Sequence, residues 1–197
     1  LSFQRLAFRV FGETGGDTRP VLEDTGKTLV LQRVIQEKKD QLGTLGESLK
    51  KTGTVSEMKS LVSELMQYDI SPEDVGEILK RSDANPLLVH KLEDIQVVYR
   101  GFQDYLRERY ITTEEILEVL CDRVEQSRIL AGSEVVLDGF TGFTPVQNKL
   151  IRKLLRLCSR VTVAVTLDPR TDRRRLKSPQ HLFRMSGQMM ERLVRMA

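Results

Sequence analysis

A strand, helix, strand pattern at 134–167 constrains the fold more than any other feature of this sequence. A short apolar run ends at Asp138, and a longer β-branched run occupies 161–167, with a helical pattern at 145–157 between them. At this spacing we expect parallel strands, buried on both faces and joined by a right-handed crossover. Ligands of such sheets bind at the carboxyl ends of the strands, so the pattern places Asp138 and Asp168 on the same rim.

Two strands alone do not form a stable sheet that is covered on both faces. The remaining strands are expected to come from sequence outside this chain or from neighbouring molecules, and a looser helical fold is the alternative. The chain begins at Leu1 without an initiating Met and inside an apolar pattern, which suggests a piece of a longer protein.

The sequence before this pattern predicts helices almost throughout. Apolar residues recur at spacings of three and four over 2–11, 25–43, 55–65 and 86–109. Hydroxyl side chains mark helix starts at Ser71, Thr112 and Thr144, and the last two begin capping boxes. The fold class is therefore α/β and predominantly α, with an all-helical region at 25–130.

The charge is distributed unevenly along the chain. Residues 1–148 contain 18 Lys and Arg against 25 Asp and Glu, whereas residues 149–197 contain 13 against three. Clustered Lys and Arg bind polyanions by releasing condensed counterions, so the last quarter of the chain points to nucleic acid. A solvated basic face, or one that pairs with acidic surface elsewhere in the parent protein, is the alternative. No apolar run is long enough to span a bilayer, so we expect a cytoplasmic protein without a membrane partner.

Two apparent binding motifs, for phosphate and for metal, are not supported by their residue spacing. Gly26-Lys27-Thr28 resembles the end of a phosphate-binding loop, but Val21 stands where that loop requires glycine, and the preceding strand is absent. Cys121 and Cys158 have no paired spacing and no nearby histidine cluster. We therefore expect two buried thiols and no metal site.

The strand that ends at Asp138 resembles the nucleotide-hydrolysis strand of motor ATPases. In those enzymes the aspartate holds Mg²⁺, and the next residue is commonly a glutamate that orients the attacking water. Here the next residue is Gly139, which has no side chain. If this is such a strand, its hydrolytic machinery is lost, and the function of the chain has to be sought in what it binds.

Five segments of the chain together carry a resemblance to one known family. The segments are Leu1 to Val10, Asp24 to Lys27, Tyr105 to Tyr110, Leu137 to Pro145 and Val161 to Leu167. They resemble AddB, which is the B subunit of ATP-dependent helicase/deoxyribonuclease and a relative of UvrD-like superfamily-one helicases. The resemblance covers nearly the whole chain, and its D-G-F-T-G-F-T-P segment is the most specific part.

The resemblance implies a domain plan. Residues 1–24 and 131–197 would be parts of a RecA-like motor domain called 1A, truncated here to a fragment of its parallel sheet. Residues 25–130 would be the helical insertion called 1B. Within the motor domain, Ser2-Phe3-Gln4 matches a DNA-contacting motif, and Asp138-Gly139 matches a degenerate Walker B motif.

The resemblance also implies a function and partners. The parent would be the B subunit of a heterodimeric helicase–nuclease that processes double-strand DNA ends for recombinational repair, with the A subunit of the heterodimer as its partner. Within it, this piece would bind single-stranded DNA without hydrolysing ATP. An iron–sulfur cluster, Mg²⁺ and possibly ATP would belong to the parent protein, and no cofactor or complete catalytic site is expected in this chain.

Candidate DNA-binding residues are polar or basic and fall in three places: the chain start, one face of the helix at 145–157, and the loop after 167. Phe140, Phe143 and Phe183 could stack on bases, although their flanking patterns favour a place in the core. The alternatives are a helical protein-interaction scaffold with no role on nucleic acid, and an active ATPase that would need Asp138. The polar and basic candidates are Gln4, Arg5, Lys149, Arg152, Lys153, Arg156, Arg170, Arg173, Arg174, Arg175 and Lys177.

Overall fold

The chain divides into two compact units. The computed structural model describes residues 1–43, 46, 52–81, 86–168, 170, 176, 178 and 180–197. Unit 1 comprises Leu1–Gly16 with Leu117–Ala197, and unit 2 comprises Asp17–Ile116. Unit 2 thus begins before the predicted helical region at 25–130 and ends before it does. The assignment of these parts to a motor domain and its insertion stays a prediction.

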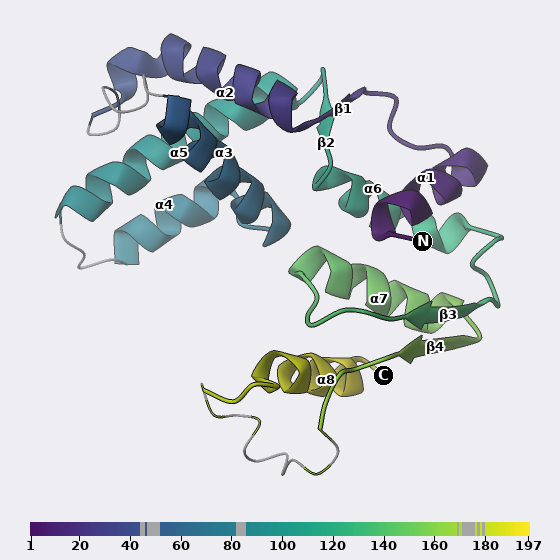
Figure 1. The fold of residues 1–197 in the computed structure, drawn as a ribbon. Helices are drawn as coiled ribbons and strands as arrows, with labels where there is room; N and C mark the ends of the chain where they lie inside the picture. Colours follow the sequence, from purple (N-terminus) through teal and green to yellow (C-terminus); the bar gives the residue numbers. More distant parts are fainter. Residues whose placement is uncertain are drawn as a thin grey trace. The chain divides into compact units, whose positions relative to one another are not determined.

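Unit 2 consists mainly of helices, whose order along the chain can be followed in Figure 1. They are α2 (Asp24–Lys38), α3 (Thr52–Gln67), α4 (Pro72–Arg81) and α5 (Pro86–Leu106), with a short 3-10 turn at Lys39–Gln41. Two very short strands, β1 (Val21–Leu22) and β2 (Ile111–Thr112), pair in parallel where the chain enters and leaves the helices. The statement that no strand precedes Gly26 is therefore wrong, because β1 lies there, although two residues are too few to show a period in the sequence.

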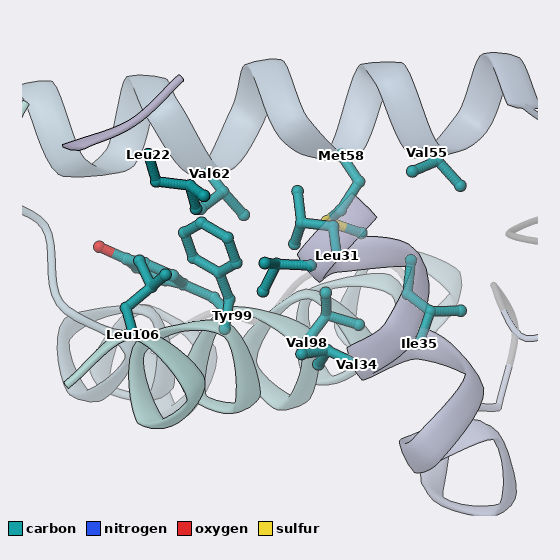
Figure 2. Close-up of a cluster of buried hydrophobic side chains, with 12 residues drawn as sticks. Leu22, Leu31, Val34, Ile35, Val55, Met58, Val62, Val98, Tyr99 and Leu106 are labelled. Carbon is teal, nitrogen blue, oxygen red and sulfur yellow. The ribbon is translucent and has the colours of Figure 1, made fainter. Parts of the chain in front are cut away.

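The core of unit 2 lies between α2, α3 and α5. Figure 2 shows Met58 and Val62 of α3 directed towards Leu31 of α2 and Tyr99 of α5. Tyr99 is 1% exposed, and its hydroxyl donates to the Ile70 carbonyl oxygen at 3.0 Å, so the buried ring keeps a polar partner. The other fully enclosed members of this cluster on α5 have no polar side-chain atoms; they are Val98, Phe102 and Leu106.

Two apolar residues of the predicted helix faces lie in solvent. Leu29 is 62% exposed and Leu88 is 48% exposed, whereas Leu31 is fully buried. The helix predicted over 25–43 also ends at Lys38, five residues before its predicted end. The error has a physical cause: each helix packs through a stripe whose exact direction is set by its neighbours, and not by the sequence pattern alone.

Unit 1 contains the predicted strand, helix, strand pattern. It includes α1 (Phe3–Thr14), most of α6 (Glu115–Arg123), a 3-10 turn at Val124–Gln126, β3 (Glu134–Leu137), α7 (Pro145–Leu157), β4 (Arg160–Val163) and α8 (Arg184–Met196). β3 and β4 are parallel, with Glu134 beside Arg160 and Leu137 beside Val163. The parallel pairing and the intervening helix confirm the prediction from the sequence.

The second strand is shorter than predicted. The β-branched run was expected to be a strand over 161–167, but β4 ends at Val163. The strand ends there because its partner β3 ends at Leu137, whose carbonyl oxygen accepts a last hydrogen bond from Ala164 N at 2.8 Å. The residues that follow have β propensity but no neighbouring strand in the part of the chain that the structure describes.

Within the described chain, one face of the sheet is covered and the other is exposed. Leu137 is 8% exposed, whereas Val136, which points to the other face, is 68% exposed. The covered face packs in one cluster with Ile151 of α7 and Met189 of α8. The 13-residue helix α8 was not predicted, and it supplies part of that cover.

Among the residues that the structure describes, no helix is both long enough and apolar enough to cross a membrane.

Candidate nucleic-acid interface

Asp138 lies directly after β3, as predicted, and it is exposed. Its Oδ1 accepts a hydrogen bond from the backbone N–H of Gly139 at 2.8 Å. Gly139 has a φ of 81°, in the left-handed region that favours glycine. A glutamate at this position would strain the backbone, so the local conformation favours the glycine that the sequence has there.

Asp168, unlike Asp138, does not lie at the end of its strand. β4 ends five residues before it, so Asp168 follows a stretch of backbone outside the regular strand. Its Oδ1 accepts a hydrogen bond from Arg170 N at 2.9 Å. The parallel strands do place their carboxyl ends at one rim, but only Asp138 is at the very end of its strand.

The segment after Asp138 carries two phenylalanines that pack with Phe3 of α1. The ring centroids of Phe140 and Phe143 are 4.9 Å apart, and that of Phe3 lies 5.3 Å from Phe140. Phe143 is 9% exposed, so this ring belongs to the core. Phe183 is partly buried, 6.1 Å from the ring of His181. The rings of Phe3, Phe140 and Phe143 attach α1 to the loop after β3.

Helix α7 separates an apolar side from a basic one. Thr144 begins the helix with the predicted capping box, in which its Oγ1 accepts from Gln147 N and the Gln147 side chain accepts from Thr144 N. The predicted Lys149, Arg152 and Arg156 are exposed. Lys153 is partly buried and lies 3.7 Å from Glu125. The side chains that attach this helix to unit 1 are Val146, Leu150, Ile151 and Leu154.

Helix α1 presents the predicted Gln4 and Arg5 to solvent. Ser2 caps the helix, because its Oγ accepts from Arg5 N at 3.2 Å. A groove of about 490 Å³ lies between α1 and β3, and the apolar side chains along it include Leu6, Ile129 and Val136. Arg9 and Asp138 also line this groove.

Of the predicted basic loop, Arg170 is exposed. Arg173, Arg174, Arg175 and Lys177 lie outside the described residues, so their role stays a prediction. Three further exposed basic residues were not among the candidates. Arg160 begins β4, one residue before the predicted strand, and Arg192 and Arg195 lie on α8, which was not predicted as a helix.

The charge of the two units differs in sign. Unit 1 has 17 Lys and Arg against nine Asp and Glu, and unit 2 has 14 against 19. Unit 1 therefore carries a net charge of +8 and unit 2 a net charge of −5, with His neutral. The positive excess of unit 1 comes from residues 149–197, because the rest of the unit has four Lys and Arg against six Asp and Glu.

The rejected phosphate-loop motif lies inside a helix. Gly26, Lys27 and Thr28 are in the first turns of α2, and Lys27 is buried against Glu114. A lysine whose ammonium is already paired and enclosed does not reach a phosphate in solvent.

The described residues contain no group of three or more His, Cys, Asp and Glu side chains arranged to hold a metal ion. Cys121 is buried, with its Sγ 3.8 Å from the Val146 carbonyl oxygen, and Cys158 is partly buried. The two thiols and their surroundings do not fit an iron–sulfur cluster, which needs a set of thiolate ligands. The expectation that this chain itself carries no cofactor stays a prediction.

A family model and several similar proteins all point to the same family. The family model described as "ADDB, N-terminal" matches residues 1–197. A protein of Lachnoclostridium phytofermentans, named as the B subunit of ATP-dependent helicase/deoxyribonuclease, is 46% identical over 197 residues, which is 100% of this chain and 17% of that protein. Proteins with the same name from Caldanaerobacter subterraneus subsp. tengcongensis and Moorella thermoacetica are 36% and 34% identical, over 99% and 100% of this chain and 16% and 17% of their own lengths. The chain thus spans about one sixth of the length of these relatives.

Proposed function

Because the chain belongs to the ADDB N-terminal family, we propose that it is a degenerate helicase-like part of a helicase–nuclease B subunit, which binds single-stranded DNA without hydrolysing ATP. The parent protein would pair with the A subunit of the heterodimer in the cytoplasm and process double-strand DNA ends for recombinational repair. Its Mg²⁺, its iron–sulfur cluster and any bound ATP would be held by the part of the relatives' length, about five sixths, that this chain does not span.

The exposed basic side of α7 is the observation that carries the DNA part of this proposal. Arg152 and Arg156 lie one turn apart on the exposed side of the helix, which unit 1 holds through the buried Leu150, Ile151 and Leu154. A fixed row of guanidinium groups on a unit of net positive charge suits contacts with the phosphates of one strand. Such contacts fix position on the strand and carry no sequence information by themselves.

Fluorescence anisotropy with a labelled oligothymidylate tests this proposal. The affinity of the wild-type chain should fall steeply between about 50 and about 200 mM salt. Replacing Arg152 and Arg156 by Ala should weaken binding and reduce the slope of log K against log salt by about 1.4, since each phosphate contact on a single strand contributes about 0.7.

A matched control removes two charges from unit 2. Lys39 and Lys91 are exposed there, and their replacement by Ala changes the net charge of the chain by the same amount. The control should leave the salt slope unchanged. Absence of wild-type binding at low salt would contradict the DNA proposal for this chain. Equal losses of affinity in the two double variants would show that the exposed side of α7 is not the binding surface and that binding depends on net charge alone.

The absence of ATP hydrolysis is supported by the sequence and geometry around Asp138. Gly139 offers no group to orient water, and Asp138 Oδ1 accepts a hydrogen bond from the Gly139 N–H. A coupled assay should detect no ATP turnover above background, with or without single-stranded DNA. Turnover that Asp138→Ala abolishes would instead establish an active ATPase.

A second candidate function, a protein-interaction scaffold, is favoured by exposed apolar side chains on unit 2. Ile78 near the end of α4 and Leu87 and Leu88 at the start of α5 are 52%, 51% and 48% exposed. These three residues lie near the same end of a helical hairpin. If they dock the A subunit, replacing Ile78 and Leu88 by Asn should prevent co-elution of the two proteins in size-exclusion chromatography, while DNA binding by unit 1 persists.

A further inference from the structure

We propose that Phe8, on the exposed side of α1 between Arg5 and Arg9, stacks on a base of single-stranded DNA. This inference rests on the proposed function, because it concerns the same ligand. It adds a contact to the base itself, whereas the basic side chains named above meet only phosphates. Phe8 is 49% exposed.

The position of Phe8 follows from the helical period. Ala7 and Val10 are fully buried and hold α1 in unit 1. Arg5 precedes Phe8 by three positions, so these two side chains are neighbours on the exposed side of the helix. Arg9 directly follows Phe8, is also exposed, and lines the groove between α1 and β3. Neither arginine has an acidic partner within ion-pair distance among the residues that the structure describes.

The Phe8 ring has support on one edge and open space on its surface. The Phe11 ring lies 6.2 Å away at an interplanar angle of 89°, an edge-to-face contact. Phe11 is itself held by Gly16, since a Cβ at residue 16 would lie only 2.7 Å from Phe11 Cγ. The backbone thus fixes Phe11, and Phe11 limits the motion of Phe8.

Gly12 keeps the Phe8 ring accessible. In a helix, a side chain covers the surface of the preceding turn, so a residue at position 12 would lie over Phe8. Glycine leaves this space empty, and no atom lies within 4 Å of the place where its Cβ would be. Its φ is outside the left-handed region, so the conformation of the helix does not itself require glycine here. A Cβ alone would not touch the Phe8 side chain, so only a longer side chain at position 12 would cover the ring.

The charges beside the ring indicate the kind of ligand. An apolar protein partner would be disfavoured by the Arg5 guanidinium group beside the ring, which it would have to desolvate. Single-stranded DNA offers a flat base for the ring and phosphates for the guanidinium group, and stacking on it does not depend on which base is present. Charge and shape therefore both favour a nucleotide over a protein segment.

Tryptophan fluorescence can detect this contact directly, because the chain contains no Trp. Phe8→Trp introduces one fluorophore at the proposed site, and Tyr68→Trp introduces one at an exposed position of unit 2. Oligothymidylate should quench the tryptophan emission of the Phe8→Trp variant as it saturates, whereas an abasic strand of the same length should not. Neither strand should quench the control variant.

Affinity measurements complete the test. Phe8→Ala and Phe8→Leu should each weaken binding of oligothymidylate about 5- to 150-fold and leave binding of the abasic strand unchanged. Gly12→Gln should produce a similar loss while favouring the helix, because a side chain would then cover the ring. This second variant keeps the test valid if the replacement of Phe8 harms the fold.

The outcomes separate the two proposals. If the wild-type chain binds neither strand at low salt, the proposed DNA function fails, and the stacking inference fails with it. If the wild-type chain binds both strands and Phe8→Leu binds oligothymidylate as tightly as wild type does, stacking on Phe8 is refuted while the DNA function stands.

Discussion

Lys27 and Glu114 form an ion pair inside unit 2 that is almost closed to solvent. Lys27 Nζ donates to Glu114 Oε1 at 2.7 Å and Oε2 at 2.8 Å, and the two side chains are 3% and 8% exposed. Thr113 Oγ1 accepts a further hydrogen bond at 3.3 Å. A lysine in the first turn of a helix is repelled by the positive end of the helix dipole, so Glu114 compensates an otherwise unfavourable position.

Breaking this pair from one side should destabilise the protein strongly. Glu114→Gln leaves the buried Lys27 ammonium with only the exposed Asp24 carboxylate, 3.6 Å away, as a counter-charge, and we expect the free energy of unfolding to fall by about 3–5 kcal/mol. Urea denaturation followed by circular dichroism measures this change. The double variant Lys27→Met with Glu114→Leu should recover much of the loss, because it removes both charges. A double variant as unstable as the single one would show that packing at these positions, and not charge, decides the cost.

Substitution of Gly139 should destabilise the protein because of its left-handed backbone conformation. Gly139→Ala places a Cβ in the left-handed region and should lower the free energy of unfolding by about 1–2 kcal/mol. Gly142 is the matched control: it lies in the same loop with open space around it and no left-handed φ, so Gly142→Ala should be neutral or stabilise by about 0.4–1 kcal/mol. Equal effects of the two substitutions in thermal unfolding would contradict the argument from backbone conformation.

Restoring the missing glutamate should therefore not restore hydrolysis. Gly139→Glu adds the side chain of an active motor strand but places it on a strained backbone, in a chain without a phosphate-binding loop. We expect no ATP turnover in a coupled assay and a loss of stability similar to that of Gly139→Ala. Measurable turnover in this variant would show that the glycine alone had silenced the site.

The sequence predicted best where the signal was local. The capping residues Ser71, Thr112 and Thr144 each precede a helix as expected, since a cap depends only on residues within one turn. The parallel pairing of β3 and β4 also follows from the chain itself, because a helix of 13 residues between two strands leaves few other arrangements.

Prediction failed where the answer depends on neighbours. The β-branched run after Val163 has strand propensity but no partner strand among the described residues, and Val136 is exposed although its sequence context is apolar. The same limit applies to the candidate site. Arg5 and Arg152 were chosen as candidates from their charge, and their role on DNA stays a prediction. Phe8 was not chosen, because an apolar side chain carries no charge signal, and its 49% exposure is seen only in the structure.

The carboxylate of Glu13 should make stability depend on pH. Partial desolvation raises the pKa of this group, but hydrogen bonds from Ser127 Oγ, Arg128 N and Ile129 N together hold it below the usual 4.5. A lowered pKa in the folded state means that the ionised group stabilises the protein above pH 4.5, and that this contribution is lost as the pH falls through the folded-state pKa.

Glu13→Gln therefore should lower the unfolding midpoint in urea at neutral pH, and the gap to wild type should narrow steadily as the pH falls below 4.5. The loss reports the carboxylate with its hydrogen bonds and its attraction to the Arg128 side chain. A gap that stays constant from neutral to acid pH would mean that the Glu13 charge does not stabilise the turn at 127–130.

Cys121 should be nearly inert in the folded protein. Burial raises the pKa of its thiol from 9.0 to about 11, so only about one molecule in a thousand carries the reactive thiolate at pH 8. In a Cys158→Ser variant, in which Cys121 is the remaining thiol, alkylation by iodoacetamide at pH 8 should be slow, and unfolding in urea should accelerate it by about 100-fold or more through ionisation and access together. The Cys121→Ser variant, which keeps the partly buried Cys158, is the control and should show a smaller acceleration. If native Cys121 were alkylated as fast as in the unfolded chain, α6 would have to open easily. The thiol would then not be buried enough for burial to raise its pKa.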